Sequence, residues 1–147
     1  MTAPALPAAL GEVVEEFAAV SPRDRLQLLL EYSQELPSLP AELSANRDRL
    51  EQVHECQTPF FVATSIDDEG RVRLFFDAPP EAPTTRGFAG ILHAGLDGVT
   101  ADEVLAVPDE FYIALGLQET ISPLRLRGMT AILRRIKHQL QERSARS

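Results

Sequence analysis

Cysteine is nearly absent from this sequence, because Cys56 is the one thiol among 147 residues. A single cysteine cannot form an internal disulfide, and the chain has neither a Cys-x-x-Cys pair nor a resolving cysteine, which argues against an autonomous disulfide oxidoreductase. His54, His93 and His138 are far apart and not at any metal-ligand spacing. One thiolate cannot build a zinc or iron–sulfur centre alone. We therefore expect no metal and no cofactor held by this chain.

Long apolar runs and phosphate-binding glycine loops are missing as well. No stretch approaches the length of a membrane span, and the N-terminus lacks the charged and apolar segments of a secretory signal. The glycines at 87, 90, 95 and 98 are scattered and do not form a GxGxxG motif. One cysteine fits a reducing compartment, so we expect a cytoplasmic protein that does not contact membranes.

Positive charge is scarce except near the C-terminus. The net charge is −8, but from Pro123 onward the chain carries +6, which leaves −14 on residues 1–122. Phosphate would repel the chain as a whole, and no aromatic residues are interleaved with the C-terminal arginines, so we expect no nucleic-acid partner. The basic segment is interpreted as a solvated helix face beside an acidic body.

The remaining composition is that of an ordinary globular protein, with 44% hydrophobic and 24% charged residues. There is no internal repeat, and the length suits one domain with a real core. We expect a single domain over residues 1–147, with residues 1–8 flexible and residues 142–147 frayed.

Local signals predict a small antiparallel sheet and several helices, which is an α+β fold. A hairpin is predicted from two β-forming runs, Phe60–Ile66 and Val72–Phe76, joined by a turn that ends at Gly70. A third strand is expected if Val53 and its neighbours pair at the edge. The predicted helices, with their capping residues, are Leu10–Val20, Pro22–Glu35 after Ser21, Arg86–Leu96 after Thr84 or Thr85, a short helix through Val107 after the capping box at Thr100, Glu110–Leu115, and Pro123–Gln141 after Ser122.

Cys56 lies just ahead of the predicted hairpin, in a polar, turn-like run. Pro59 cannot join a strand ladder and biases the residue before it towards an extended form, so a cysteine here can point outward. His54 favours a thiolate at this position, whereas Glu55 opposes one. A lone cysteine is also commonly a small buried hydrophobe. The local chemistry leaves both interpretations open.

Fragments spread along most of the chain resemble the SufE family, the sulfur acceptors of cysteine desulfurases. The Cys56-Gln57-Thr58 run is similar to that family's Cys-Gln-Ser, and other fragments occur in family order at matching spacing. They are Arg25-Leu26-Gln27, Tyr32, Leu36-Pro37-Ser38-Leu39-Pro40, Asn46, Val53, Arg86-Gly87-Phe88, Leu115-Gly116-Leu117, and Ser122-Pro123-Leu124-Arg125 with Gly128. The resemblance implies the fold that SufE shares with NifU-like scaffold proteins.

The resemblance also implies a chemistry. Cys56 would accept persulfide sulfur from a pyridoxal-phosphate desulfurase of the SufS type and pass it to an iron–sulfur cluster assembly scaffold of the SufBCD type, with the pyridoxal phosphate belonging to the partner. Removing the sulfur would free the desulfurase for another turnover, so the protein would be both a sulfur acceptor and an activator of the desulfurase. A covalent cysteine persulfide would make the protein a sulfurtransferase-like accessory without autonomous turnover. The sequence leaves open a homodimer.

Six further residues are candidates for a supporting or structural role: His54, Glu55, Gln57, Arg86, Arg125 and Gly128. For Arg125 a structural ion pair is favoured over direct catalysis. Gly128 inside a helix costs about 1 kcal/mol against alanine, which suggests close packing against another element. The chain departs from the family pattern at Glu55, where a glycine is usual, at Thr58, and near Phe61, where the family has a tryptophan.

Three alternatives stay open at this point. The protein could be a CsdE-like acceptor for a different desulfurase, a non-covalent interaction module with an inert Cys56, or a redox sensor that oxidises at Cys56.

Overall fold

The computed structural model describes residues 6–146. Residues 1–5 of the segment 1–8 that we expect to be flexible, and residue 147 of the segment 142–147 that we expect to fray, lie outside the described part. Within it are six α-helices, three short 3₁₀ turns and a three-stranded antiparallel sheet. The α-helices are α1 Ala8–Ala18, α2 Pro22–Glu35, α3 Ala41–Ala45, α4 Pro83–Leu96, α5 Ala101–Leu105 and α6 Pro123–Arg146. The strands are β1 Glu51–Gln52, β2 Phe61–Ile66 and β3 Val72–Asp77, and the 3₁₀ turns are η1 Arg47–Arg49, η2 Phe111–Ile113 and η3 Leu117–Glu119. The predicted α+β class is confirmed.

The sheet has the order β1-β2-β3, with the predicted hairpin formed by β2 and β3 and the two-residue strand β1 at its edge. Val62 of β2 lies opposite Phe76 of β3 on one side and opposite Glu51 of β1 on the other. Because side chains alternate along a strand, one face of the hairpin carries apolar residues into the main core. The other face is covered by a smaller apolar cluster that includes Leu43 of α3 and Ala63 of β2.

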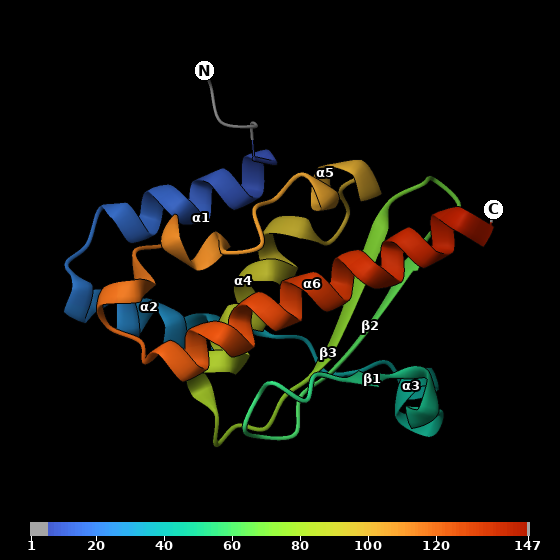
Figure 1. Cartoon of the computed structure of the whole chain (residues 1–147), viewed down its shortest axis with the longest axis horizontal. Helices are drawn as coiled ribbons and strands as arrows, with labels where there is room; N and C mark the ends of the chain where they lie inside the picture. Colours follow the sequence, from blue (N-terminus) through green and yellow to red (C-terminus); the bar gives the residue numbers. More distant parts are fainter. Residues whose placement is uncertain (1–5, 147) are drawn as a thin grey trace.

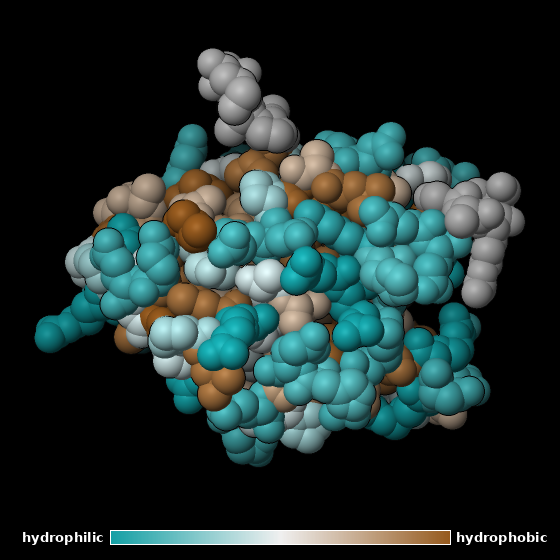
Figure 2. Space-filling view, viewed as in Figure 1, coloured by the Kyte–Doolittle hydropathy of each residue, from teal (hydrophilic) through white to brown (hydrophobic). Residues whose placement is uncertain are grey.

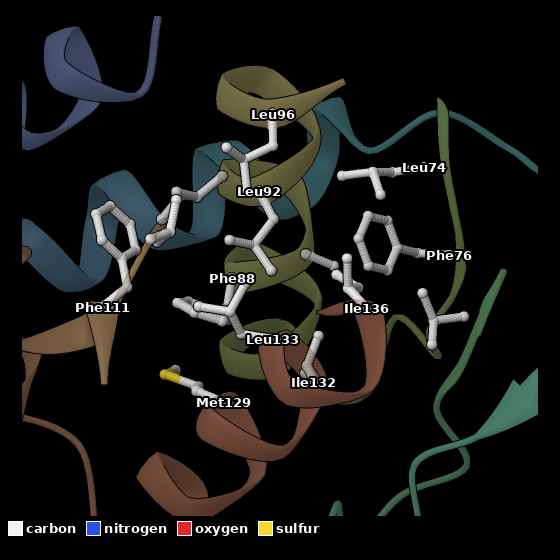
Figure 3. Close-up of a cluster of buried hydrophobic side chains, with 14 of the residues drawn as sticks. Leu74, Phe76, Phe88, Leu92, Leu96, Phe111, Met129, Ile132, Leu133 and Ile136 are labelled. Carbon is white, nitrogen blue, oxygen red and sulfur yellow. The ribbon is translucent and has the colours of Figure 1, made fainter. Parts of the chain in front are cut away.

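Helices α4 and α6 cover the core face of the sheet. Long helix α6 crosses β2 and β3 (Figure 1). Figure 3 shows Phe76 of β3 turned towards the side chains of α4 and α6. The predicted apolar stripe of α6 is fully buried, and it consists of Met129, Ile132, Leu133, Ile136 and Leu140. Hydrophilic residues cover much of the surface along the outward side of this helix (Figure 2).

Helices α2 and α4 pack closely because two glycines of α4 face the backbone of α2. A Cβ atom on Gly87 would lie less than 3.0 Å from the carbonyl oxygen of Leu29, and one on Gly90 equally close to that of Tyr32. Real Cβ atoms do not approach oxygen so closely, so these two positions require glycine. The crossing fixes α4, whose first turn borders the site described below.

Three of the four predicted helix caps are formed. Ser21 accepts a hydrogen bond from the amide of Asp24, and the capping box at Thr100 is complete. Helix α6 starts at Pro123 after Ser122, as predicted, but continues to Arg146 rather than ending near Gln141.

Four local predictions are wrong. Helix α1 spans Ala8–Ala18, two residues earlier than predicted, and the segment predicted as Glu110–Leu115 forms only the single turn η2. Neither Thr84 nor Thr85 caps α4, because Pro83 already occupies its first position and Ala82 precedes it without a side-chain cap. The α5 helix also ends at Leu105, before Val107.

Candidate functional site

Cys56 lies in the loop that connects β1 to β2. The loop is closed at its base by the amide of Val53, which donates to the carbonyl of Phe60 at 2.8 Å. Inside the loop, the amide of Cys56 donates back to the carbonyl of Val53 at 3.2 Å. The edge pairing expected near Val53 therefore exists, and it makes the Cys56 segment the tip of a second hairpin. A hairpin loop presents its central residues away from the sheet, here towards α6.

The sequence left open whether Cys56 is sheltered or exposed, and in the structure its thiol is covered. Only 9% of the residue is exposed, and Sγ lies 3.9 Å from the carbonyl oxygen of Gly128 in α6. Glycine permits this approach, because a Cβ atom at position 128 would lie 3.3 Å from Sγ. Gly128 thus packs closely against another element, as its cost within a helix suggested. The local polarity of the loop gave no sign of the cover, because the cover comes from a helix 72 residues further along the chain.

Burial controls the charge state of the thiol. It raises the pKa of Cys56 from 9.0 to about 12, and the neighbouring carboxylate of Glu55 adds to the rise. The direction predicted for Glu55 agrees with this, but its effect is second to the loss of hydration. At neutral pH the resting thiol is protonated and a poor nucleophile.

A pocket of about 180 Å³ adjoins the thiol. It is bordered by three segments: the Cys56 loop, the start of α4 and the first turns of α6. These segments contribute Glu55, Cys56, Gln57 and Thr58 from the loop, residues 81–85 from the start of α4, and Leu124, Arg125 and Gly128 from α6. The pocket is large enough for an added sulfur atom on Cys56 without rearrangement of the core.

The other predicted site residues separate into two groups. Glu55, Gln57, Arg125 and Gly128 lie at the pocket. His54 is exposed and Arg86 is half-buried, and neither lines the pocket.

Arg86 has a structural role, because Nε donates to the carbonyl of Ser33 at 2.8 Å and Nη1 donates to that of Ala78 at 2.6 Å. It thereby joins the end of α2 to the segment before α4. The structural ion pair expected for Arg125 is not formed with any residue in the described part of the chain, and its side chain is exposed at the rim of the pocket.

Arg135 of α6 is a site residue that the sequence did not reveal. Its Nη1 atom lies 2.8 Å from Oε2 of Glu51 in β1, and its Nη2 atom lies 3.8 Å from Oε1 of Glu55. Arg135 therefore joins α6 to both the edge strand and the residue before Cys56. Nothing in the sequence marks a contact between residues so far apart, apart from the unusual glutamate at 55.

Two other kinds of site would need features that residues 6–146 do not have. No cluster of three or more histidine, cysteine, aspartate or glutamate side chains is arranged to hold a metal ion there. No helix in that range is both long and apolar enough to cross a membrane.

The fold and the site define a small α+β protein with one sheltered thiol at the tip of a hairpin loop. The family model described as "SufE: Fe-S metabolism associated domain" matches residues 11–140, and the chain belongs to the SufE family. It is 58% identical over 143 residues to an "Uncharacterized SufE-like protein" of Mycobacterium tuberculosis, covering 97% of this chain and 99% of that protein.

Two further similarities agree with the family. "SufE-like protein 1, chloroplastic/mitochondrial" of Arabidopsis thaliana is 29% identical over 88% of this chain, which matches 34% of that longer protein. A solution structure of a hypothetical protein from Thermus thermophilus superimposes with a TM-score of 0.83 at 43% identity, and the match covers 94% of this chain and 97% of that one.

Proposed function

We propose that the protein is a sulfur acceptor in iron–sulfur metabolism and that Cys56 carries the sulfur as a persulfide. Membership of the SufE family supports the general role. The observation that carries the specific one is the position of Cys56, the chain's single thiol, beside a pocket that can hold one more sulfur atom.

The sulfur donor in this proposal is a cysteine desulfurase of the SufS type. The thiolate of Cys56 attacks the outer sulfur of the desulfurase persulfide, the sulfur–sulfur bond of that persulfide breaks, and the desulfurase cysteine leaves as a thiolate. A new sulfur–sulfur bond forms on Cys56, so no net oxidant or reductant is consumed. The acceptor then passes the sulfur to an iron–sulfur assembly scaffold of the SufBCD type. Pyridoxal phosphate belongs to the desulfurase, and the acceptor needs no cofactor.

Burial of Cys56 sets a condition on this transfer. A sulfur atom on another protein cannot reach a thiol that is 9% exposed beneath Gly128, so the loop must open when the partner binds. Opening also restores hydration and lets the thiol ionise. Between transfers, the closed loop shelters the sulfur from water and oxidants. The same shelter weighs against a role as a peroxide sensor, because oxidation also requires the thiolate.

The decisive experiment mixes the purified protein with a SufS-type desulfurase and L-cysteine and measures the intact mass. The mass of the protein should rise by one or more sulfur atoms, and Cys56→Ser should show neither the mass gain nor stimulation of the desulfurase. Full stimulation by the serine variant would exclude the covalent relay and favour a non-covalent interaction module. Replacing the SufS-type enzyme by a cysteine desulfurase of a different type tests the CsdE-like alternative, which would be favoured if only that second enzyme loads Cys56.

A further inference from the structure

An ion-pair bridge connects the Cys56 loop to α6. Arg135 contacts Glu51 at 2.8 Å and Glu55 at 3.8 Å, and its side chain is only 29% exposed. The two carboxylates differ in setting, since Glu51 belongs to β1 whereas Glu55 immediately precedes Cys56 in the loop. A single guanidinium thus links a fixed strand and a loop residue to the same helix.

We propose that Arg135 is a positioning residue that holds the Cys56 loop closed against α6 through Glu55. This inference rests on the proposed function in taking Cys56 as the sulfur-accepting residue, and it adds the contact that keeps this residue covered until a partner binds.

The contact between Arg135 and Glu51 is the fixed half of the bridge, and Glu51 is held in place by a second side chain of α6. One turn along α6, Nε2 of Gln139 donates to Oε1 of Glu51 at 2.8 Å, so the carboxylate of Glu51 is held by two side chains of the same helix. Arg135 is therefore oriented by its contact with Glu51, and its second nitrogen is presented to Glu55. A fork of fixed donors suits this double contact better than a lysine would.

The contact between Arg135 and Glu55 is the weaker and more accessible half of the bridge. Its distance of 3.8 Å is longer, and the Glu55 side chain is 53% exposed. A charged group on a partner surface can compete for either side chain here without entering the core. The thiol itself contributes only the 3.9 Å contact with the carbonyl oxygen of Gly128, and the ion pair adds a charged contact between the loop and α6.

The bridge also bears on the chemistry of Cys56. Glu55 raises the pKa of the thiol, and a guanidinium beside Glu55 offsets part of its negative potential. The charged side chains at the thiol pocket are Glu55, Glu81 and Arg125. Opening the loop separates Glu55 from Arg135, so hydration and the charge beside the thiol change together.

The test is a double-mutant cycle between Arg135 and Glu55, with loop opening as the readout. Hydrogen exchange of a peptide spanning the loop, followed by mass spectrometry, reports opening that disrupts the turn in which the Cys56 amide is bonded to Val53, and each rate is divided by that of the same variant in urea. The rate of alkylation of Cys56 by a small neutral reagent is the second readout, because Sγ lies against Gly128 in the closed loop. Each rate is divided by that of the same variant in urea, since Glu55 also acts on the ionisation of the thiol. The variants are Arg135→Gln, Glu55→Gln and the two together, each checked for native circular dichroism.

Arg134→Gln is the matched control, because it removes the same charge from the neighbouring residue of α6. Arg134 is paired with Asp109 at 3.4 Å, not with the Cys56 loop. Glu51→Gln is the second comparison, because it removes the charge of the strand carboxylate that orients Arg135 and leaves Glu55 in place.

Partly exposed ion pairs have modest strength, so we expect Arg135→Gln and Glu55→Gln each to speed exchange by about two- to fivefold. The double variant should exchange no faster than the faster single variant, whereas Arg134→Gln should match the parent.

Independent, multiplying effects of the two substitutions would overturn the proposal, and so would an effect of Arg134→Gln equal to that of Arg135→Gln. If Glu51→Gln speeds exchange and Glu55→Gln does not, the strand contact alone holds the loop and the proposal is wrong. Should Arg135→Gln fail to fold, Glu55→Gln still tests the same contact from its exposed side. Neither readout uses a desulfurase, so failure of persulfide loading in the parent would count against the proposed function and leave this result standing.

Discussion

Two glycine contacts in this molecule look alike in the sequence but differ in what the glycine touches. In the α2–α4 crossing, Gly87 and Gly90 lie against the backbone of α2, where a Cβ atom would come within 3.0 Å of carbonyl oxygens. At the site, Gly128 lies against the Sγ atom of Cys56, and a Cβ atom there would be 3.3 Å away. The first contact joins two helices that cannot separate without loss of the core. The second joins a helix to a loop with a pocket beside it. We infer that the first is permanent and the second is built to open.

The largest effect should follow from breaking the permanent contact. Gly90→Ala should reduce the free energy of unfolding by about 3 kcal/mol or more, because the added methyl group meets the backbone of Tyr32 and neither helix can yield easily. Urea denaturation followed by circular dichroism measures this loss. Gly11→Ala is the control in α1, where an added Cβ has nothing within 4 Å, and it should raise stability by up to about 1 kcal/mol. Equal effects at the two positions would show that the α2–α4 contact can accommodate an added methyl group.

The covered state of the loop predicts the next effect in size. With burial raising the pKa of Cys56 from 9.0 to about 12, the thiolate fraction at pH 8 is roughly a thousandfold lower in the native protein than in the same chain in urea, and its reaction with iodoacetamide should be slower by about that factor. Mass spectrometry of quenched samples gives both rates. Similar rates in the two states would mean that the loop is open in solution most of the time, and the contrast with the α2–α4 crossing would be lost.

The sequence predicted those parts of the fold that depend on neighbouring residues. The serine–proline starts of α2 and α6 and the capping box at Thr100 are formed as expected, because a cap needs only the next few residues. The predicted cap of α4 is wrong, and the reason is equally local. Two threonines compete with Pro83 for the start of the helix, and the proline, with φ already set, takes the first position.

The sequence predicted the nucleophile of the site but not the residues that surround it. The uniqueness of Cys56 and the resemblance of its flanking residues identified the thiol, and the cost of Gly128 indicated a close approach. The sequence does not say what approaches Gly128, and the contact between Arg135 and Glu55 is equally hidden in it, because both are properties of the tertiary arrangement. In the same way, the sequence of α2 does not show that Leu26 and Leu30 are 43% and 38% exposed while Leu29, between them, is buried.

The pH dependence of the free energy of unfolding tests whether the Cys56 loop is closed, and its expected effect is of intermediate size. The fold raises the pKa of Cys56 from 9.0 to about 12, so below pH 9 the thiol is protonated in both folded and unfolded chains and its contribution to stability is complete. As the pH rises above 9, the unfolded thiol ionises while the folded one stays protonated, and the folded state loses stability until the pH passes about 12. At pH 10 the loss is about 1.4 kcal/mol.

Denaturation of the parent and of Cys56→Ser at pH 8 and pH 10 measures this loss. Tyr32 and Tyr112, whose pKa values are also raised, are present in both proteins, so their contributions cancel in the difference. The stability of the parent should fall by more than that of the serine variant over this interval. Parallel declines would show that the thiol is hydrated in the native state.

The smallest effect on stability is expected at the contact that opens, and Gly128→Ala tests it. An alanine gains about 1 kcal/mol over glycine within a helix, which favours the variant. The added methyl group would lie 3.3 Å from Sγ and 3.7 Å from Cα of Cys56, so the loop must move by a few tenths of an ångström. The pocket beside the thiol gives the loop space to do so, unlike the backbone of α2 at Gly90. We therefore expect a change in unfolding free energy of less than about 1 kcal/mol, together with a severalfold faster reaction of Cys56 with iodoacetamide, because the displaced loop covers the thiol less well. A loss of stability as large as that of Gly90→Ala would show that the loop is as rigidly packed as the helix crossing, and the distinction between a permanent and an opening contact would not hold.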